Sequence, residues 1–323
     1  MPVIESNYRH PRLLKNPHLH TVLSAVLRKK PQVAYVRERL ELPDGDFIDL
    51  DWSVKDKRRL VILAHGMEGS SKSKYILHTV QAINNAGVSA VAWNMRGCSG
   101  DINRKLHFYH SGKTEDLAAV VDHARQLGFR KIYLVGFSLG GNLTLLYLAR
   151  AAEKIRREIQ RAVAICAPVD LVTSQDQIER KENRLYLKRF LRDFHKKFER
   201  KRQHRKIYID TQKFHRRIRT LADLDAHYTA PWNGFPNEKE YYRSASSLPL
   251  LQQIRIPTLL LNPKDDTFLS ENCYPVAEAK NSNLFHLEMP ETGGHCAMLT
   301  NYRLRESYME RRILEFLQLN PTG

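Results

Sequence analysis

The segment Gly136–Gly140 reads GFSLG, which matches the pattern G-x-S-x-G and places Ser138 at its centre. The apolar run KIYLV precedes this segment and GNLTLLYLARAA follows it, which predicts a strand that turns sharply into a helix. Such a turn exposes the serine hydroxyl at the edge of a sheet, and glycines on both sides remove the Cβ atoms that would clash there. We therefore expect Ser138 to be a nucleophile. The alternative is a glycine-rich turn with an incidental serine.

A serine hydroxyl is a weak nucleophile and needs a base, which in turn needs an orienting acid. In enzymes built around a strand–turn–helix serine, the acid and then the histidine follow the serine along the chain. Asp265 and Asp266 lie at the end of the strand-like segment IPTLLLNPKDD, residues 256–266. His295 stands in a Gly-Gly-His turn after another strand-like run. This order predicts His295 as the base.

Two neighbouring aspartates compete for the role of the acid. Asp266 precedes Phe268 and Leu269, whose side chains could anchor the loop in the core while the carboxylate faces the histidine. We therefore expect Asp266 to be the acid, with Asp265 as the alternative. Either residue could instead cap a helix that begins near Ser270.

A developing oxyanion needs hydrogen-bond donors. The segment Ala64–Gly69 follows the first buried run, where a turn can supply one backbone N–H, and the residue after the nucleophile supplies another. We expect these donors to be the N–H groups of Met67 and Leu139, each typically worth about 3–4 kcal/mol. The turn could also serve only to end a strand. Gly66, which precedes Met67, and Phe137, which precedes Ser138, are expected to contact the substrate.

Motifs of other catalytic classes are missing from the sequence. It has no HExxH, no Cys/His spacing of a zinc site, no Walker-type loop and no GxGxxG, so we expect neither a metal nor a cofactor. Cys296 follows His295, which suggests a thiol nucleophile as an alternative, but residues adjacent in sequence rarely face each other usefully. We expect all four cysteines, Cys98, Cys166, Cys273 and Cys296, to be small buried hydrophobes.

The elements that must position these residues follow from hydrophobic periodicity. Alternation on both sides of Pro43-Asp44-Gly45 predicts an antiparallel hairpin over residues 33–54. Nearly continuous apolar runs, typical of strands buried on both faces, occur at Leu60–Ala64, Val88–Trp93, Ile132–Val135, Ala162–Cys166 and Thr258–Leu261. Helices are predicted over Ser73–Ala86, Thr114–Leu127 with Thr114 as its cap, Leu139–Ala152 and Tyr302–Leu317. The alternation predicts an α/β fold with a mostly parallel central sheet behind an antiparallel N-terminal hairpin.

Composition narrows the class of protein. The chain has 323 residues, of which 42% are hydrophobic, so it can bury a core and is not disordered. It has neither an apolar run long enough for a transmembrane helix nor a signal-peptide pattern. The scattered cysteines favour a reducing, cytoplasmic location. With 52 Lys+Arg against 35 Asp+Glu, the net charge is +17, which permits an anionic partner without requiring one.

Most of this charge lies in one insertion. Ile178–Arg219 holds 17 Lys+Arg and 5 Asp+Glu, a difference of 12. Apolar residues from Leu185 to Phe198 fall at helical spacing, which predicts an amphipathic helix with its apolar face on a pocket and its cations outside. The cations are most simply a solvated face; the alternative is a weak contact with an anionic surface, and nucleic acid has no strong support. We expect three parts: residues 1–32 packed on the core, a core of residues 33–170 and 249–323, and a helical cap of residues 171–248.

Several sequence blocks together resemble the YheT-like branch of the α/β-hydrolase superfamily, which contains bacterial esterases and eukaryotic abhydrolase-domain lipases. In chain order they are NPHLHTVL, RERLELPDGDFIDLDW, HGMEGSSKSKY, NMRGCSGDINRKLHFYHSGKTEDL, GFSLGGN, YTAPWNGF with YYRSAS, and IPTLLLNPKDDTF. The resemblance implies an α/β-hydrolase fold and a triad of Ser138, Asp266 and His295. Two features depart from the family pattern. Before the residues TAP the family usually has a sequence close to FDD, whereas this chain has Leu224–Tyr228. The insertion 178–206 is also unusually basic.

The expected function is a serine hydrolase of carboxylic esters that works through an acyl-enzyme. The resemblance implies short- to medium-chain or lipid-derived acyl esters as substrates. An acyltransferase or thioesterase with the same triad is one alternative. A second alternative is a binding protein on a hydrolase scaffold that docks on an anionic membrane or RNA through Ile178–Arg219.

Overall fold

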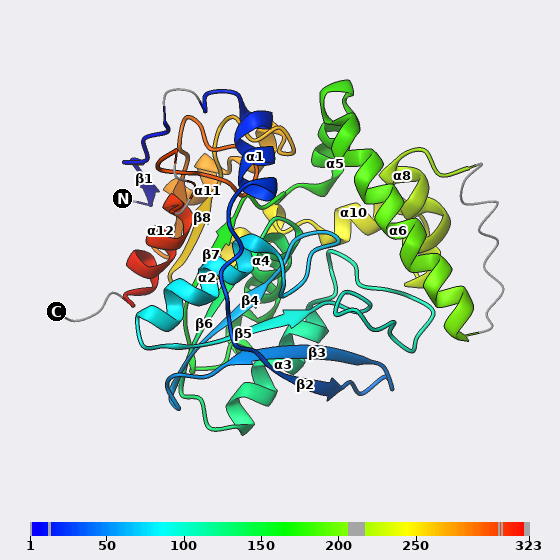
Figure 1. Ribbon diagram of the computed structural model, residues 1–323, viewed down its shortest axis with the longest axis horizontal. Helices are drawn as coiled ribbons and strands as arrows, with labels where there is room; N and C mark the ends of the chain where they lie inside the picture. The colour runs from blue at the N-terminus through cyan, green and yellow to red at the C-terminus, as the bar shows by residue number, and fades with distance from the viewer. Residues whose placement is uncertain (1, 12–13, 206–216, 303, 305, 320–323) are drawn as a thin grey trace.

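The computed structural model describes residues 2–11, 14–205, 217–302, 304 and 306–319 (Figure 1). Its centre is a nine-stranded sheet with the order β1-β9-β8-β7-β6-β4-β5-β3-β2. The strands are β1 (Val3–Ile4), β2 (Val36–Glu41), β3 (Phe47–Ser53), β4 (Arg59–Ala64), β5 (Ser89–Asn94), β6 (Lys131–Phe137), β7 (Ile159–Ile165), β8 (Thr258–Leu261) and β9 (Phe285–Glu288). Residues 206–216, which belong to the predicted basic insertion Ile178–Arg219, lie outside the described residues.

The sheet is parallel except at one edge. β1 and β4 to β9 pair in parallel, whereas β3 pairs antiparallel with both β5 and β2. The β2–β3 hairpin turns at Asp44 and Gly45, and Gly45 takes the positive φ of 79° that only glycine adopts without strain. The predicted α/β fold with an antiparallel entry hairpin is therefore confirmed.

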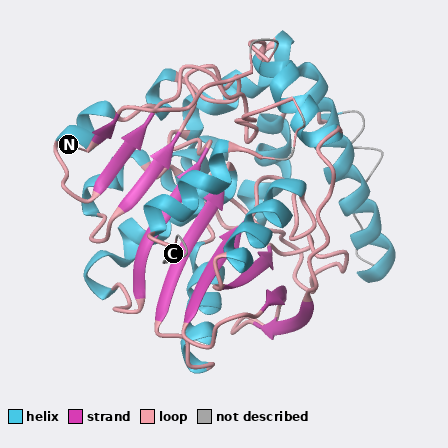
Figure 2. Cartoon of the chain, turned by 60° about the vertical axis from the view of Figure 1, so that its left-hand side comes forward, coloured by secondary structure: helices cyan, strands magenta, loops and turns pink. Residues whose placement is uncertain are grey.

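Helices cover both faces of the sheet, as Figure 2 shows. The helices of the core are α1 (Pro17–Val26), α2 (Lys74–Asn85), α3 (Thr114–Gln126), α4 (Leu139–Ala151), α11 (Val276–Lys280) and α12 (Tyr308–Leu317). α2 and α12 bury Val80 and Ile313 in one apolar cluster, while α3 and α4 bury Val120 and Leu143 in the other. Each face of the sheet thus has its own hydrophobic core, which holds the strand ends rigidly in place.

Two helix starts differ from the sequence prediction. Thr114 is the first residue of α3 and not its cap; Lys113 takes the cap position, and the Thr114 hydroxyl instead lies 3.4 Å from the Arg150 guanidinium of α4. The last helix begins at Tyr308, six residues later than the predicted start, because Ser307 forms a capping box there with the third helical residue.

The insertion between β7 and β8 is helical and gathers on one side of the sheet (Figure 1). It comprises α5 (Leu171–Glu179), α6 (Arg184–Arg205), α8 (Leu221–Leu224), a π-helical turn (Asp225–Thr229), α9 (Ala230–Trp232) and α10 (Glu238–Ala245). We call this set of elements the cap. None of the described helices meets the length and hydropathy needed to span a bilayer.

The predicted amphipathic helix exists as α6, but the prediction that its cations lie outside is wrong for two of them. Lys197 and Lys201 are buried, whereas Leu185 is 79% exposed. Lys201 Nζ donates to Asn103 Oδ1 at 2.8 Å and to the Leu106 carbonyl at 2.9 Å. Burying a lysine is tolerable only when partners replace its hydration, and the loop before α3 provides them.

Candidate active site

Ser138 lies in the turn between β6 and α4, where the sequence predicts it. Its backbone has φ 53° and ψ −124°, a strained conformation for a non-glycine residue. A Cβ at Gly136 would lie 2.2 Å from the Gly140 carbonyl oxygen, and a Cβ at Gly140 would lie 2.5 Å from the Ala64 oxygen. The two glycines of the motif are therefore required by close backbone approach, which lets α4 start directly against β4.

In the structure the side chains of Ser138, His295 and Asp266 form a continuous chain of hydrogen bonds. His295 Nε2 lies 3.0 Å from Ser138 Oγ, and His295 Nδ1 lies 2.8 Å from Asp266 Oδ2. Asp266 is buried and also accepts a hydrogen bond from the Phe268 N–H. Asp265 faces elsewhere, accepting from the Gly294 N–H at 2.9 Å. Geometry thus favours Asp266 over Asp265 as the partner of His295.

The charge state of His295 depends on its neighbours. Burial by itself lowers the pKa of His295, but the Asp266 carboxylate and then Cys296 raise it by more, so the net pKa lies above the ordinary 6.5. Asp266 also fixes the tautomer, because a carboxylate at Nδ1 holds the proton there and leaves Nε2 free to accept one. The imidazole is thus set up as a proton acceptor for the Ser138 hydroxyl.

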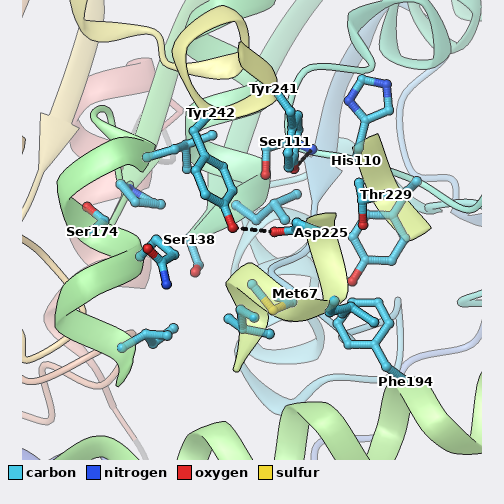
Figure 3. Close-up of a pocket in the computed structure, with 18 of the residues that line it drawn as sticks. Met67, His110, Ser111, Ser138, Ser174, Phe194, Asp225, Thr229, Tyr241 and Tyr242 are labelled. Carbon is cyan, nitrogen blue, oxygen red and sulfur yellow. Dashed lines mark hydrogen bonds between the residues drawn. The ribbon is translucent and has the colours of Figure 1, made fainter. Parts of the chain in front are cut away.

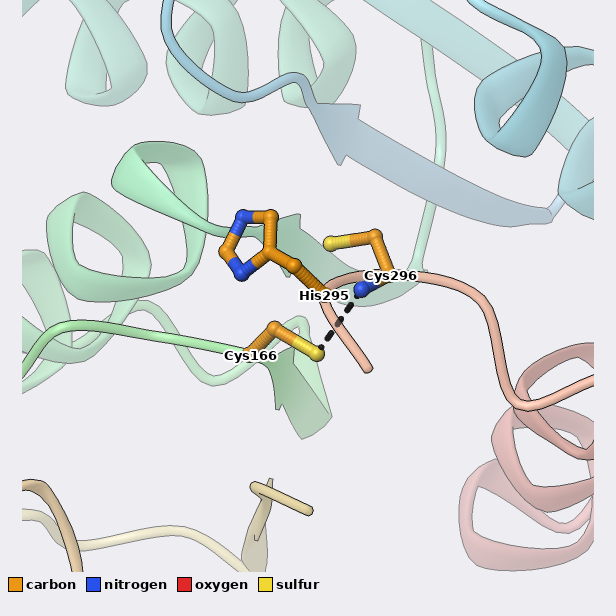
Figure 4. Close-up of side chains that lie close together, drawn as sticks. All are labelled: Cys166, His295 and Cys296. Carbon is orange, nitrogen blue, oxygen red and sulfur yellow. Dashed lines mark hydrogen bonds between the residues drawn. The ribbon is translucent and has the colours of Figure 1, made fainter. Parts of the chain in front are cut away.

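Contacts from distant parts of the chain hold the turn that carries His295. Its backbone N–H donates to Thr21 Oγ1 of α1 at 2.9 Å, and the Cys296 N–H donates to Cys166 Sγ at 3.1 Å (Figure 4). The Phe268 ring lies 4.3 Å from the imidazole, centroid to centroid. The Thr21 contact was not predicted, although Thr21 belongs to the block NPHLHTVL.

Cys166, His295 and Cys296 form the group of side chains in the described residues that could offer ligands to a metal, with ligand atoms within 4.8 Å of one another. Both ring nitrogens of His295 already lie at hydrogen-bond distance from Asp266 and Ser138, however. A metal bound through the imidazole would have to displace one of them. The arrangement therefore suits proton transfer better than metal binding.

The turn after β4 presents the expected oxyanion donors. Within the described part of the chain, neither the Met67 nor the Leu139 N–H donates a hydrogen bond, and both residues line the same pocket as Ser138. Tyr75 and Tyr109 hold the turn on both sides of Met67: the Gly66 N–H donates to Tyr75 Oη, and the Glu68 N–H donates to Tyr109 Oη, each at 2.9 Å. The sequence analysis did not identify these two tyrosines.

His65 fixes the other side of this turn. Its Nε2 accepts from the Met95 N–H at 3.1 Å, so its Nδ1 carries the proton and donates to the Gly66 carbonyl at 2.8 Å. Burial lowers the pKa of His65 to about 4, which keeps the ring neutral and in this tautomer at ordinary pH.

Gly66 and Phe137 are not among the residues that line the pocket, so their expected contact with substrate finds no support in the side-chain geometry. Phe137 is fully buried on the opposite face of the sheet, 4.9 Å from the Tyr75 ring. Gly66 instead has a spacing role, because a Cβ there would lie 3.0 Å from the Cβ of Ser138.

The pocket beside Ser138 is walled mainly by apolar and aromatic side chains of the cap. These include Leu171, Ile178, Phe194, Phe198, Leu221, Leu224, Tyr228 and Trp232. Its main polar feature is the pair Asp225–Tyr242, with the Tyr242 hydroxyl donating to Asp225 Oδ2 at 2.7 Å (Figure 3). Burial raises the pKa of Asp225 to about 6, although its hydrogen bonds lower it. Asp225 belongs to Leu224–Tyr228, the segment that departs from the family pattern.

A buried ion pair joins the cap to the turn that carries Met67. Lys197 Nζ of α6 lies 2.5 Å from Glu68 Oε1, and both side chains are less than a tenth exposed. The Tyr109 hydroxyl donates to the same carboxylate at 2.8 Å, and Lys197 also donates to Cys98 Sγ at 3.2 Å. Cys98 is thus a partner of Lys197 and not only a small apolar residue. Glu68 stands in the block HGMEG, but its partner could not be identified from the sequence.

Comparison with known proteins matches this chain to one family. A family model described as alpha/beta hydrolase fold matches residues 59–302. The Escherichia coli (strain K12) protein named "Putative esterase YheT" is 34% identical over 317 residues, which cover 95% of this chain and 91% of that protein. The chain therefore belongs to the α/β-hydrolase family and, within it, to the ester hydrolases related to YheT.

Other similar proteins agree with this family. Human "Phospholipase ABHD3" is 28% identical over 309 residues, covering 92% of this chain and 75% of that protein. The Saccharomyces cerevisiae "Monoacylglycerol lipase" is 28% identical over 279 residues, covering 83% of this chain and 60% of that protein. Among solved structures, a Pyrococcus furiosus esterase shares the fold with a TM-score of 0.59 and 15% identity, over 99% of this chain and 97% of that chain.

Proposed function

We propose that the chain hydrolyses acyl esters by a serine mechanism, with Ser138 as nucleophile, His295 as general base and Asp266 as the acid that orients it. The observation that carries this proposal is the hydrogen-bonded line from Asp266 through His295 to Ser138, which opens on an apolar pocket. A base at hydrogen-bond distance from a serine, itself held by a buried carboxylate, is the arrangement that activates a hydroxyl.

The proposed reaction has two halves. Ser138 Oγ attacks the carbonyl carbon while His295 Nε2 takes the hydroxyl proton, and the N–H groups of Met67 and Leu139 hold the oxyanion. The C–O bond to the alcohol then breaks, and His295 returns the proton to the leaving oxygen. In the second half His295 deprotonates a water molecule, whose oxygen attacks the acyl carbon. The bond from that carbon to Ser138 Oγ then breaks, and His295 returns the proton to Oγ, which releases the carboxylic acid and restores the Ser138 hydroxyl.

The apolar wall of the pocket supports a proposal for the class of substrate. The cap, residues 171–248, supplies leucine and aromatic side chains beside Ser138, which suit an acyl chain better than a charged group. We propose short- to medium-chain or lipid-derived acyl esters as substrates. In this proposal residues 33–170 and 249–323 form the catalytic core, and residues 1–32 pack on it.

A fluorophosphonate probe tests the nucleophile. Wild-type protein should be labelled, Ser138→Ala should not, and Ser174→Ala is the matched control because Ser174 lines the same pocket. Equal labelling of wild type and Ser138→Ala would contradict the assignment.

A series of p-nitrophenyl esters of increasing chain length, compared with acyl-CoA substrates, tests the reaction. We expect hydrolysis of the oxygen esters, with the highest kcat/KM at short to medium chain length. Turnover of CoA thioesters alone would make the enzyme a thioesterase instead.

A further inference from the structure

Helix α1 exposes an apolar face that no described part of the chain covers. Leu19, Val22 and Val26 follow one another at helical spacing and are 44%, 43% and 63% exposed, and Leu27, just past the helix, is 59% exposed. Single exposed apolar residues are common in proteins, but four of them on one short helix are not scattered. We call these four residues the α1 apolar face.

Positive charge gathers at the C-terminal end of the α1 apolar face. Residues 6–37 contain seven Lys and Arg and no Asp or Glu. Arg28 is used internally, in a buried ion pair with Glu310, but Lys29 and Lys30 at the end of α1 are exposed. Lys74 of α2 reaches the same end of the helix and donates to the Val26 carbonyl at 2.6 Å. Lys29, Lys30 and Lys74 therefore place a cationic rim at this end of the α1 apolar face.

The buried side of α1 supports the candidate active site. Thr21 Oγ1 accepts the His295 N–H, and the neighbouring Gly294 has no room for a side chain, because a Cβ there would lie 2.7 Å from Pro17 O. α1 therefore lies directly behind the turn that carries the base. Its exposed face points away from that turn, since the same short helix contacts the turn with its other side.

α1 also reaches the pocket wall through the cap. His18 of α1 stacks on Tyr186 of α6 with ring centroids 5.8 Å apart, and Tyr186 packs edge-on against Phe268 at 4.9 Å. Phe268 lines the pocket beside His295. These ring contacts thus run from α1 to the wall of the pocket where the substrate is expected.

We propose that the α1 apolar face, with its cationic rim, is a docking surface for an anionic lipid bilayer. A helix with an exposed apolar side and lysines at its end can lie in the interfacial layer of a membrane, where the apolar side chains enter the acyl region and the cations meet lipid phosphates. Docking this way places the pocket wall near the bilayer, where lipid-derived esters are found.

Vesicle sedimentation tests the proposal with the full chain. Wild-type protein should bind vesicles of phosphatidylcholine with phosphatidylglycerol, more weakly vesicles of phosphatidylcholine alone, and less at high salt. The double variant Val22→Asp/Val26→Asp should bind the anionic vesicles at least about tenfold more weakly, because it loses two interfacial apolar contacts and adds two like charges. The matched control is Val36→Asp/Val54→Asp, which changes two exposed valines of the β2–β3 hairpin by the same charge.

Each remaining outcome overturns the proposal. Equal vesicle binding by both double variants, or no binding by wild type, means that the α1 apolar face is not a lipid surface. A dimer of wild type that light scattering shows to dissociate in Val22→Asp/Val26→Asp means that a second copy of the chain covers the face. Salt-sensitive RNA binding without vesicle binding assigns the cationic rim to nucleic acid.

The docking test does not depend on the proposed catalytic residues. Vesicle binding should be unchanged in Ser138→Ala, which lacks the proposed nucleophile. Conversely, Val22→Asp/Val26→Asp should keep its rate on a water-soluble p-nitrophenyl ester and lose rate only on an ester presented in anionic vesicles. A failed docking test thus leaves the proposed function standing, and a failed labelling test leaves the docking surface standing.

Discussion

Lys197 of the cap helix and Glu68 of the turn after β4 form a buried ion pair, with Nζ 2.5 Å from Oε1. Glu68 directly follows Met67, the proposed oxyanion donor, and has a positive φ of 52°. The residue that contacts the cap, Glu68, is therefore joined directly by a peptide bond to the residue that carries the proposed donor N–H. The cap both walls the pocket and holds the turn on which the proposed chemistry depends.

We expect Lys197→Met to lower kcat by about 10- to 100-fold while changing KM little. The variant leaves Glu68 buried without its cation, so the turn should shift and the Met67 N–H should no longer point at the oxyanion, for which loss of a donor costs up to about 10³-fold. Breaking a buried pair also costs about 3–5 kcal/mol of stability, so activity must be measured well below the melting temperature.

Lys196→Met is the matched control for this variant, since Lys196 is the exposed neighbour on α6. It should keep both kcat and the melting temperature. If Lys197→Met loses stability but keeps its kcat at low temperature, the ion pair anchors the cap and does not position the turn.

Asp266→Asn should lower kcat by about 10³- to 10⁴-fold, because an amide at this position no longer selects the tautomer of His295 that can accept a proton. The pH profile should change as well. Asp266 raises the pKa of His295, so its removal lowers that pKa, and the acid limb of kcat/KM should move to lower pH. Asp265→Asn, which changes the neighbouring carboxylate, should cost far less activity and leave the limb in place. Equal effects of the two variants would contradict the assignment of Asp266.

Local sequence signals are enough to predict most of the sheet and, in the candidate site, Ser138, Asp266 and His295. The apolar runs match strands because a two-sided buried strand must be apolar along its length; Thr258–Leu261 is β8 residue for residue. Ser138 and His295 could be found because each sits in a glycine-rich turn directly after such a run. Because the strands before these two turns are parallel, their carboxyl ends lie at the same edge of the sheet, and that edge carries both Ser138 and His295.

Support from distant residues could not be predicted. Thr21 and His295 are 274 residues apart, and Lys197 is 129 residues from Glu68. Hydrophobic periodicity places Lys197 on a helix that carries many other cations. The neighbouring sequence does not distinguish a lysine that bonds a buried acceptor from one that is exposed to solvent. The prediction that Thr114 caps α3 was wrong for a similar reason, because the Thr114 hydroxyl has a partner in the distant helix α4, Arg150.

Asp225→Asn should stabilise the protein above pH 6 by about 1–3 kcal/mol and have little effect below pH 4. Burial raises the pKa of Asp225 from 3.8 to about 6, so between these values the unfolded chain releases its proton before the folded chain does. Ionisation therefore costs folded-state stability as pH rises, and asparagine avoids that cost while still accepting from Tyr242. Melting temperatures on both sides of this range test the sign; an equal change at both pH values would show that Asp225 acts through packing alone.

Gly140→Ala should destabilise the fold by about 3 kcal/mol or more and abolish labelling of Ser138. The new Cβ would lie 2.5 Å from the carbonyl oxygens of both Ala64 and His65, which are backbone atoms that cannot rotate away. α4 would have to move off β4, and both the serine turn and the Met67 turn would open. Gly112→Ala is the control, because the nearest atom to its Cβ would be the Ala245 Cβ at 3.1 Å, with the Ala245 Cα at 3.4 Å and His110 Cε1 at 3.5 Å. Urea midpoints should fall steeply for the first variant and little for the second. An unchanged midpoint for Gly140→Ala would mean that close backbone approach is not the reason for the second glycine of the motif.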